Sequence, residues 1–248
     1  MKTVHIVMPC FNEAEGIQEF IDEIYKELES IDFEITVIDD ASQDKTAHTL
    51  SLLEKKYNTF HYFVNTKNMG HGMSTILAMN KGIESGSEII CTVDGDGQFL
   101  GKDIAIVISA LRNEHYDVIE GCRVSRNEAL FRRIVTRTVK WLVYLTVGAP
   151  PTDANTPLRA YRRDTLSMML VKIPKETLIP NLFISALSRR LKVQIKEIDV
   201  TSLPRRGQEV LGSTWNQKTK LLPSRRFIRF CINASVEWIK FSTRMSRY

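Results

Sequence analysis

Two carboxylates and an amide follow one apolar run at a spacing that could bind a metal ion. Asp94, Asp96 and Gln98 come directly after residues 89–93 (IICTV) and are separated from one another by single residues. If that run is a strand that continues extended, alternate side chains point the same way, and the three would present oxygens to a common point. Oxygen ligands suit a hard divalent cation such as Mg²⁺ or Mn²⁺, which is usually held by one or two carboxylates and by substrate phosphates. The pattern therefore predicts a metal site for a phosphorylated substrate.

Two other structures can begin with the same residues. An EF-hand loop also opens with D-x-D, but its sixth and twelfth positions need Gly and Glu, and here they are Phe99 and Ala105. A solvated turn is the simpler alternative, because Asp and Gly are ordinary turn residues. The polar residues that follow the other strands, described below, favour the metal site.

The composition is typical of a globular protein in a reducing compartment. A chain of 248 residues can bury a sizeable core. The four cysteines (Cys10, Cys91, Cys122 and Cys231) are dispersed and lack metal-site spacing, so we expect small buried side chains and not disulfides. No signal peptide precedes the first apolar run, and no stretch approaches the roughly 18 apolar residues of a membrane span. We expect a cytoplasmic protein.

The net charge of +5 conceals an uneven distribution. Residues 165–248 hold 16 Lys and Arg against 5 Asp and Glu, whereas the preceding residues carry a net negative charge. A basic C-terminal third is typical of a protein with an anionic partner, such as phosphate or a membrane surface, although a solvated basic face is the simpler alternative.

Strand and helix patterns alternate over the first 120 residues. Short apolar runs predict strands, and apolar residues at helical spacing predict helices between them. The predicted strands are Val4–Met8, Glu34–Ile38, Phe60–Val64, Glu88–Val93 and Asp117–Glu120; the predicted helices are Ile17–Leu28, Asp44–Tyr57, Met73–Glu84 and Asp103–Arg112. This order predicts a mostly parallel sheet whose ligands bind outside the carboxyl ends of the strands.

Polar residues and glycines follow each of the first four predicted strands. They form the segments Pro9–Glu13, Asp39–Asp44, Asn68–Gly72 and Asp94–Gln98. Neither a P-loop nor a G-x-G-x-x-G motif is present, which argues against a P-loop NTPase or a dinucleotide enzyme. Acidic residues at one sheet edge indicate metal-assisted handling of a nucleoside diphosphate instead.

Four segments, in this order, resemble the family 2 glycosyltransferases, which are inverting enzymes of the GT-A fold. They are residues 7–13 (VMPCFNE), 37–46 (VIDDASQDKT), 94–98 (DGDGQ) and 153–159 (DANTPLR). The resemblance implies an α/β, Rossmann-like, mostly parallel sheet flanked by helices, with an amphipathic helical extension. We expect a GT-A domain over residues 1–212, with a nucleotide-sugar half at about 1–122 and an acceptor half at about 123–212. The basic segment 213–248 would form the extension.

Within that family, the chain looks most like the polyprenol-phosphate group, which includes the dolichol-phosphate mannose synthases. The similar segments are residues 121–123 (GCR), the basic pair Arg132 and Arg133, residues 205–209 (RRGQE) and residues 241–244 (FSTR). In many members of that group transmembrane helices follow, so this chain would be a member without them, a shortened member, or one half of a two-chain system.

The resemblance also implies roles for individual residues. Asp94, Asp96 and Gln98 would hold Mg²⁺ or Mn²⁺ on the diphosphate. The donor nucleotide would lie against Pro9, Phe11, Glu13, Asp39, Asp40 and Asp94, with loop packing or helix capping as the alternative roles. The catalytic residues would be Asp96, Arg123 and Asp153, with Asp153 as general base if the acceptor is an alcohol. The acceptor phosphate would bind Arg132, Arg133, Arg205 and Arg206, because arginine binds phosphate bidentately.

Other polar groups near these residues have simpler interpretations. His71 lies between two glycines and is interpreted as a solvated loop histidine, and Gly70 and Gly72 as residues of a tight turn.

Residues 224–244 combine bulky apolar residues with arginines, which suits a helix in a membrane interface, or else one packed on the domain or a protein partner.

The function predicted from the sequence is thus a peripheral membrane hexosyltransferase. It would use a UDP- or GDP-sugar as donor and a polyprenyl phosphate as acceptor, with an integral membrane protein as a further expected partner. Transfer to a glycan or protein hydroxyl, a sugar-1-phosphate nucleotidyltransferase and a non-catalytic nucleotide-binding module are the alternatives. Nucleic acid is not expected as a partner, because no nucleic-acid motif appears beside the acidic sheet edge.

Overall fold

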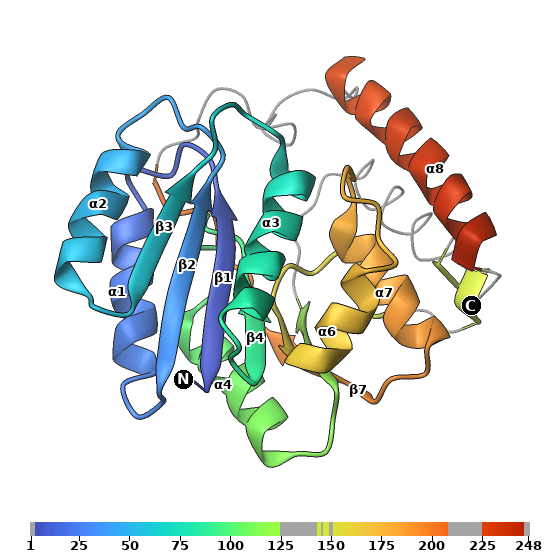
Figure 1. The fold of residues 1–248 in the computed structure, drawn as a ribbon, viewed down its shortest axis with the longest axis horizontal. Coiled ribbons are helices and arrows are strands. Elements are labelled where there is room, and N and C mark those ends of the chain that lie inside the picture. The colour runs from blue at the N-terminus through green and yellow to red at the C-terminus, as the bar shows by residue number, and fades with distance from the viewer. Residues whose placement is uncertain (1–2, 125–142, 145, 149–150, 208–224, 246–248) are drawn as a thin grey trace.

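A seven-stranded sheet lies between two layers of helices in the computed structural model (Figure 1). The structure describes residues 3–124, 143, 144, 146–148, 151–207 and 225–245. The strands are β1 (Val4–Cys10), β2 (Phe33–Asp39), β3 (Phe60–Val64), β4 (Ile89–Thr92), β5 (Val118–Arg123), β6 (Arg159–Arg162) and β7 (Ile195–Val200). Their order across the sheet is β3-β2-β1-β4-β6-β5-β7. Every neighbouring pair is parallel except the two that include β6.

The helices cover both faces of this sheet. They are α1 (Ile17–Glu27), α2 (Thr46–Lys56), α3 (His71–Glu84), α4 (Gly101–Asn113), α6 (Arg163–Leu170), α7 (Pro180–Arg190) and α8 (Arg225–Met245). Alternate residues of β1 point to opposite faces: Ile6 and Met8 join the cluster that contains the buried faces of α1 and α4, whereas Val7 joins the cluster of α3 and α7. This division explains why the central strands are apolar at nearly every position.

The first half of the chain confirms the predicted elements. All five strands and four helices predicted before residue 124 are present, with differences of a few residues at their ends. Regular periodicity explains this agreement: in α1, for example, Ile17, Phe20, Ile21 and Ile24 are fully buried along one face. The predicted fold class, a GT-A-like α/β sheet with a C-terminal helix, is likewise confirmed.

Strand β6 was not among the predicted elements, and it runs antiparallel between β4 and β5. Arg159, at its first position, is fully buried and donates from Nε to Glu120 Oε1 on β5 at 3.0 Å. Arg189 on α7 donates to the other oxygen of Glu120 at 2.8 Å. The buried carboxylate is thus compensated by two guanidinium groups, which join β5, β6 and α7.

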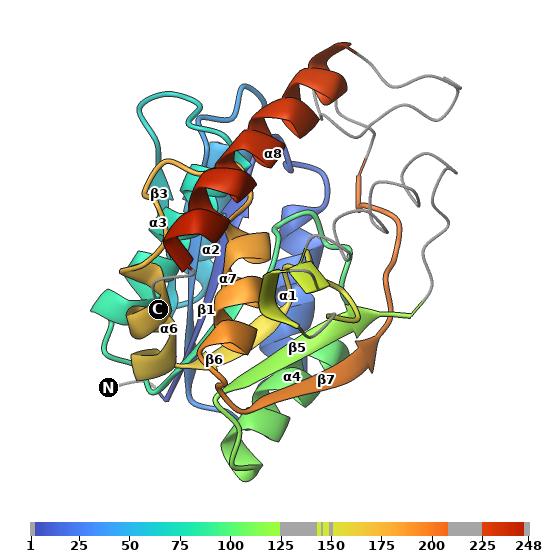
Figure 2. The same ribbon diagram turned by 90° about the vertical axis from the view of Figure 1, so that its right-hand side faces the viewer.

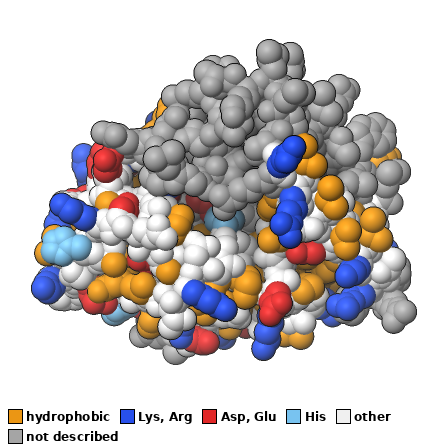
Figure 3. Space-filling view, turned by 90° about the horizontal axis from the view of Figure 1, so that it is seen from above, with side chains coloured by type: hydrophobic (Ala, Val, Ile, Leu, Met, Phe, Trp, Pro, Cys, Tyr) orange, Lys and Arg blue, Asp and Glu red, His pale blue; other side chains and the backbone are white. Residues whose placement is uncertain are grey.

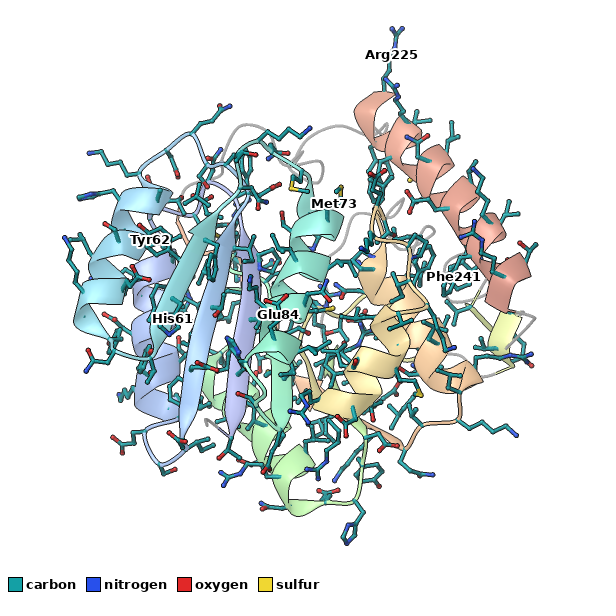
Figure 4. All side chains as sticks on the ribbon, viewed as in Figure 1. His61, Tyr62, Met73, Glu84, Arg225 and Phe241 are labelled. Carbon is teal, nitrogen blue, oxygen red and sulfur yellow. The ribbon has the colours of Figure 1, made fainter. Side chains whose placement is uncertain are left out.

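Helix α8 lies on the outside of α7 (Figures 1 and 2). Its inner face is buried through Phe227, Trp238 and Phe241, and the Phe241 and Phe183 rings stack with centroids 4.0 Å apart. In Figure 4, Phe241 lies on the side of α8 that faces α7, whereas Arg225 points away from the rest of the molecule. Over the residues described, no helix combines the length and apolar character needed to cross a membrane. The predicted boundaries near residues 122 and 212 stay predictions.

Candidate active site

The acidic loop after β4 lies directly beside the end of β1. Gly95 N donates to Pro9 O at 3.1 Å, and a Cβ added at Gly95 would lie 2.9 Å from the Cβ of Cys10. A larger residue at position 95 would therefore push the loop away from β1. This contact places Asp94 and Asp96 at the carboxyl end of the sheet, where ligands of parallel α/β proteins bind. Figure 3 looks onto that edge.

The loop turns at Gly95 and Asp96 and does not continue the extended strand. Strand β4 ends at Thr92, and Gly97 has a φ of +67°, a left-handed conformation that favours glycine. The sequence predicted that Asp94, Asp96 and Gln98 point the same way because alternate residues of an extended chain do so. This loop is not extended, so that reason does not apply. The proximity of Asp94 and Asp96 depends on the turn.

The two aspartates form a site of concentrated negative charge. Burial raises the pKa of Asp96 to about 7, with the charge of Asp94 as the second cause. Loss of hydration also raises the pKa of Asp94, and His71 opposes that rise. A cation between these carboxylates would relieve their repulsion. Over the described residues no group of three or more His, Cys, Asp and Glu side chains is arranged to hold a metal ion. A cation at Asp94 and Asp96 would therefore need further ligands from substrate phosphates and water.

Gln98 contacts the chain near residue 203. Its Nε2 donates to Leu203 O at 3.2 Å, and Leu203 N donates to Gln98 O at 2.8 Å. The Gln98 amide nitrogen is therefore bound within the protein. The predicted role of Gln98 as a metal ligand concerns its other side-chain atom, Oε1, and stays a prediction.

Arg206 attaches the segment 201–207 to the acidic loop. Its backbone N donates to Asp96 O at 3.1 Å and its Nε to Gly97 O at 3.2 Å. Its guanidinium also forms ion pairs with Glu19 and Glu23 on α1. The Arg206 side chain is only 12% exposed, and its contacts hold the acidic loop against α1. Its predicted contact with an acceptor phosphate is untested.

Arg205 forms an ion pair with Glu13. Its Nε donates to Glu13 Oε2 at 2.9 Å, its Nη2 contacts Glu13 Oε1, and Nη2 also donates to Phe11 O at 3.3 Å. Burial raises the pKa of Glu13 to about 8, while the hydrogen bond from Arg205 opposes the rise. Two residues predicted for different substrates, Glu13 for the nucleotide and Arg205 for the acceptor phosphate, thus contact each other. The other two predicted phosphate ligands, Arg132 and Arg133, lie outside the described residues.

The adjacent aspartates at the end of β2 differ in their hydrogen bonding. Asp40 Oδ1 accepts from Met69 N at 2.8 Å, and its Oδ2 accepts from Gly70 N at 2.8 Å, so this side chain holds the loop before α3. Asp39 Oδ1 accepts from Ser42 N at 3.0 Å, but its buried Oδ2 has no partner among the described residues. Burial raises the pKa of Asp39. Of the two, only Asp39 has a carboxylate oxygen without a hydrogen-bond partner among the described residues.

Arg123 and Asp153 also contact each other. Arg123 Nε donates to Asp153 Oδ2 at 2.7 Å, and Nη2 donates to Asp153 Oδ1 at 3.3 Å. The structure therefore brings together two of the three predicted catalytic residues, at the end of β5 and in the segment before β6. Their roles in the reaction stay predictions.

His71 is a site residue that the sequence interpretation placed in a solvated loop. It is the first residue of α3, and its Nε2 lies 3.6 Å from Asp94 Oδ1 with the side chain 54% exposed. A Cβ added at the next residue, Gly72, would lie 2.1 Å from Thr177 O, so this glycine permits a close approach of the backbone. The signal in the sequence was the histidine between two glycines before a helix.

Comparison with known proteins identifies the group to which these features belong. A family model described as "Glycosyl transferase family 2" matches residues 5–170. Among solved structures, the chain is similar to glucosyl-3-phosphoglycerate synthase from Mycobacterium tuberculosis in complex with phosphoglyceric acid. The TM-score is 0.63 at 12% identity, over 98% of this chain and 80% of that one.

Two further structures share the fold at 18% identity. One is a mannosyltransferase from Pyrobaculum calidifontis in complex with GDP-Man and Mn²⁺, with a TM-score of 0.58 over 82% of this chain and 57% of that chain. The other is residues 1–349 of TarS from S. aureus, with a TM-score of 0.56 over 81% of this chain and 60% of that one. This chain therefore spans somewhat under two thirds of the length of these two.

Proposed function

Because the chain belongs to glycosyl transferase family 2, we propose that it transfers a sugar from a nucleoside diphosphate sugar to a polyprenyl phosphate at a membrane surface. The chain is a glycosyltransferase, and the proposal specifies its acceptor and its place of action. The observation that carries the acceptor assignment is the outer face of α8.

Both the inner and the outer face of α8 carry apolar side chains. Those on the outer face recur at helical spacing and are between 45% and 61% exposed: Ile228, Ile232, Val236 and Ile239. Arg229 and Lys240 are exposed on the same helix. Figure 3 shows hydrophobic and basic side chains on the side of the molecule that carries α8. A helix with apolar residues and flanking basic residues binds the interface of an anionic membrane, where a polyprenyl phosphate would be found.

On the donor side, Asp94 and Asp96 would hold Mg²⁺ or Mn²⁺, the cofactor that we propose for this site. The metal supplies charge neutralisation for the leaving nucleoside diphosphate, an effect of several kcal/mol. We propose that Asp39 Oδ2, which has no partner among the described residues, accepts a hydrogen bond from a nucleoside hydroxyl when the donor binds. The residues of the chain thereby orient the donor at the edge formed by β1, β2 and β4.

A phosphate acceptor agrees with the pairing of Arg123 and Asp153. An alcohol acceptor needs a general base, whereas a lipid phosphate is already ionised near neutral pH and needs orientation. Asp153 is engaged by Arg123 at both oxygens, while Arg123 Nη1 makes no hydrogen bond to a described residue. We therefore propose that Asp153 orients Arg123 toward the acceptor phosphate. The arrangement favours a phosphate over a hydroxyl acceptor.

The test is a transfer assay on vesicles that contain anionic lipid and a polyprenyl phosphate. The purified protein is incubated with Mn²⁺ and with UDP- and GDP-sugars in turn, and products are identified by mass spectrometry. We expect a polyprenyl-phosphate sugar with one donor. A parallel reaction supplies soluble glycan and peptide hydroxyls. Transfer to these acceptors, with no product on the lipid, would refute the acceptor assignment.

Membrane binding is tested separately with matched isoleucine variants. Ile232→Glu and Ile239→Glu place a charge on the outer face of α8, and we expect at least a tenfold loss of vesicle binding. Ile106→Glu is the control, since Ile106 on α4 is 49% exposed and lies on another helix. Equal binding by all variants would show that α8 does not contact the membrane.

A further inference from the structure

Helix α8 contains a single acidic residue, Glu237, and this side chain binds the segment before α7. Thr177 Oγ1 and Leu178 N both donate to Glu237 Oε2 at 3.0 Å. Ile179 N in turn donates to Thr177 Oγ1 at 3.2 Å. The carboxylate therefore lies near the N-terminal end of α7, where backbone N–H groups lack helical partners and the helix dipole favours a negative charge.

The segment that Glu237 binds is in direct contact with the start of α3. Residue Thr177 is only 3% exposed, and a Cβ added at Gly72 would lie 2.1 Å from Thr177 O. In Figure 1 the segment before α7 lies between α3 and α8. Because close-packed interiors transmit displacements, a shift of residues 177–179 would also shift the chain at Gly72.

His71 lies between two residues that are held in place. On one side, Gly70 N donates to Asp40 Oδ2 at 2.8 Å. On the other side, Gly72 packs against the segment before α7, as described above. The His71 side chain reaches the acidic loop, with its Nε2 3.6 Å from Asp94 Oδ1. The place of His71 beside Asp94 thus depends on both neighbours.

The aromatic side chains of α8 attach the helix to the domain separately from Glu237. Phe241 and Trp238 pack on Phe183 of α7, with ring centroids 4.0 and 6.1 Å away. Apolar packing is non-directional, so it does not fix the orientation of residues 177–179. The two hydrogen bonds to Glu237 supply that direction. Substitution of Glu237 therefore removes the link to this segment and leaves the aromatic contacts in place.

We propose that Glu237 is a positioning residue for the donor site. Through residues 177–179 it holds His71 beside Asp94. Helix α8 thus acts on the donor site from within the protein, apart from the membrane contact proposed for its outer face. The inference rests on the donor part of the proposed function. Its consequence is that a substitution on α8 changes both the surroundings of His71 and the affinity for a nucleotide.

The first measurement uses the protein without metal, nucleotide or lipid. The imidazole signals of the five histidines are recorded by ¹H–¹³C NMR at one pH, and that of His71 is assigned by its loss in His71→Ala. We expect Glu237→Ala to shift the His71 signal and to leave that of His48, an exposed residue of α2, unchanged. Glu237→Gln keeps an oxygen acceptor, so it should restore the wild-type signal.

Two further variants test the link from both of its ends. Thr177→Val removes the hydroxyl donor with a side chain of nearly the same shape, and it should shift the His71 signal as Glu237→Ala does. Ser235→Ala is the matched control on α8, because the Ser235 hydroxyl is exposed and donates to Cys231 O of the same helix. It should leave all the histidine signals unchanged. Thermal melts of each variant show whether the fold is kept.

The second measurement is the dissociation constant of UDP and of GDP with Mn²⁺, again without lipid. Glu237→Ala should weaken binding of the preferred nucleotide by about fivefold, at the low end of the usual coupling between distant sites. In a His71→Ala background, Glu237→Ala should change the constant by less than about twofold, because its effect passes through His71. Equal weakening in both backgrounds would show that Glu237 does not act through His71.

The outcomes separate this inference from the proposed function. If the wild type binds a nucleotide with Mn²⁺ and Glu237→Ala changes neither the His71 signal nor the dissociation constant, the inference is wrong and the proposed function stands. A shifted signal with an unchanged constant would also overturn it, because His71 would have moved without effect on the donor site. If the wild type binds no nucleotide, the donor part of the proposed function fails and the positioning role fails with it.

Discussion

Arg123 holds the carboxylate of Asp153 at both of its oxygens, with Nε 2.7 Å from Oδ2 and Nη2 3.3 Å from Oδ1. A general base must present an oxygen to the proton that it removes, and this bidentate pair occupies both oxygens of Asp153. Arg123 and Asp153 are therefore expected to act together. Substitutions in this pair distinguish a phosphate acceptor from a hydroxyl acceptor.

Asp153→Asn should reduce the transfer rate to a phosphate acceptor by less than about tenfold, because the amide oxygen still accepts a hydrogen bond from Arg123. Loss of a general base would instead cost about 10²- to 10⁴-fold. The rate is measured with a polyprenyl phosphate acceptor at saturating donor. A loss of about 10²-fold or more in Asp153→Asn would identify Asp153 as the base.

The double variant Arg123→Ala/Asp153→Ala should lose little more activity than Arg123→Ala alone. Residues in contact give non-additive effects, since removal of the first partner already removes the interaction. The four kcat/KM values of the double-mutant cycle give the coupling. Fully additive losses would show that the two side chains act separately.

Asp96→Asn should abolish the increase in thermal stability that Mn²⁺ and a nucleoside diphosphate give together. A ligand at about 100 times its dissociation constant stabilises a protein by about 2.7 kcal/mol, which a thermal melt resolves. Transfer activity should fall by at least about 100-fold, because metal neutralisation of the leaving group is worth several kcal/mol. Glu54→Gln, an exposed substitution on α2, is the control. An intact metal-dependent shift in Asp96→Asn would remove this aspartate from the metal site.

Arg206→Ala should weaken the binding of Mn²⁺ with nucleotide by about tenfold. The substitution removes the hydrogen bond to Gly97 O and both ion pairs to α1. The pair with Glu19 contributes little, because that glutamate is largely exposed. Only the part of the loss that disturbs the acidic loop should appear in the affinity for the metal and the nucleotide. Calorimetric titration with UDP or GDP measures the effect. Arg190→Ala, an exposed arginine on α7, should bind as the wild type does. Equal affinities of Arg206→Ala and Arg190→Ala for UDP or GDP with Mn²⁺ would show that Arg206 does not position the acidic loop for binding.

The stability of the fold should fall between pH 7 and pH 5 because of His5. Burial lowers the pKa of His5 from 6.5 to about 4, and its Nε2 lies 2.8 Å from Thr36 Oγ1. The unfolded chain therefore binds more protons between these pH values, so this contribution is present above pH 6.5 and is lost as the pH falls towards 4. The loss from pH 7 to pH 5 is about 2 kcal/mol.

Urea unfolding of the wild type and of His5→Gln at both pH values measures this contribution. The variant lacks the titrating group, so the difference in its unfolding free energy between pH 7 and pH 5 should be smaller by about 2 kcal/mol. The same pH difference in both proteins would assign the acid sensitivity to other groups.

The sequence alone predicted the elements that repeat at a regular spacing. Apolar runs predicted the strands from β1 to β5, and helical spacing predicted α1 to α4, because burial of one face depends on local periodicity. The sequence also predicted that the loops after β1, β2 and β4 lie close together. Parallel strands have their carboxyl ends at one edge, so Pro9, Asp39 and Asp94 had to lie near one another.

Only the tertiary structure decided which charged residues pair. Arg205 pairs with Glu13 across 192 residues of sequence, and Arg206 reaches α1 across more than 180. Arg123 pairs with Asp153 across 30 residues. Spacing alone carries no information on such pairs, because any acid and any base can pair once folding brings them together. The sequence therefore determined the family, the sheet and its acidic edge. The packing of the late segments onto that edge determined which of its charged groups are engaged within the protein and which remain for a ligand.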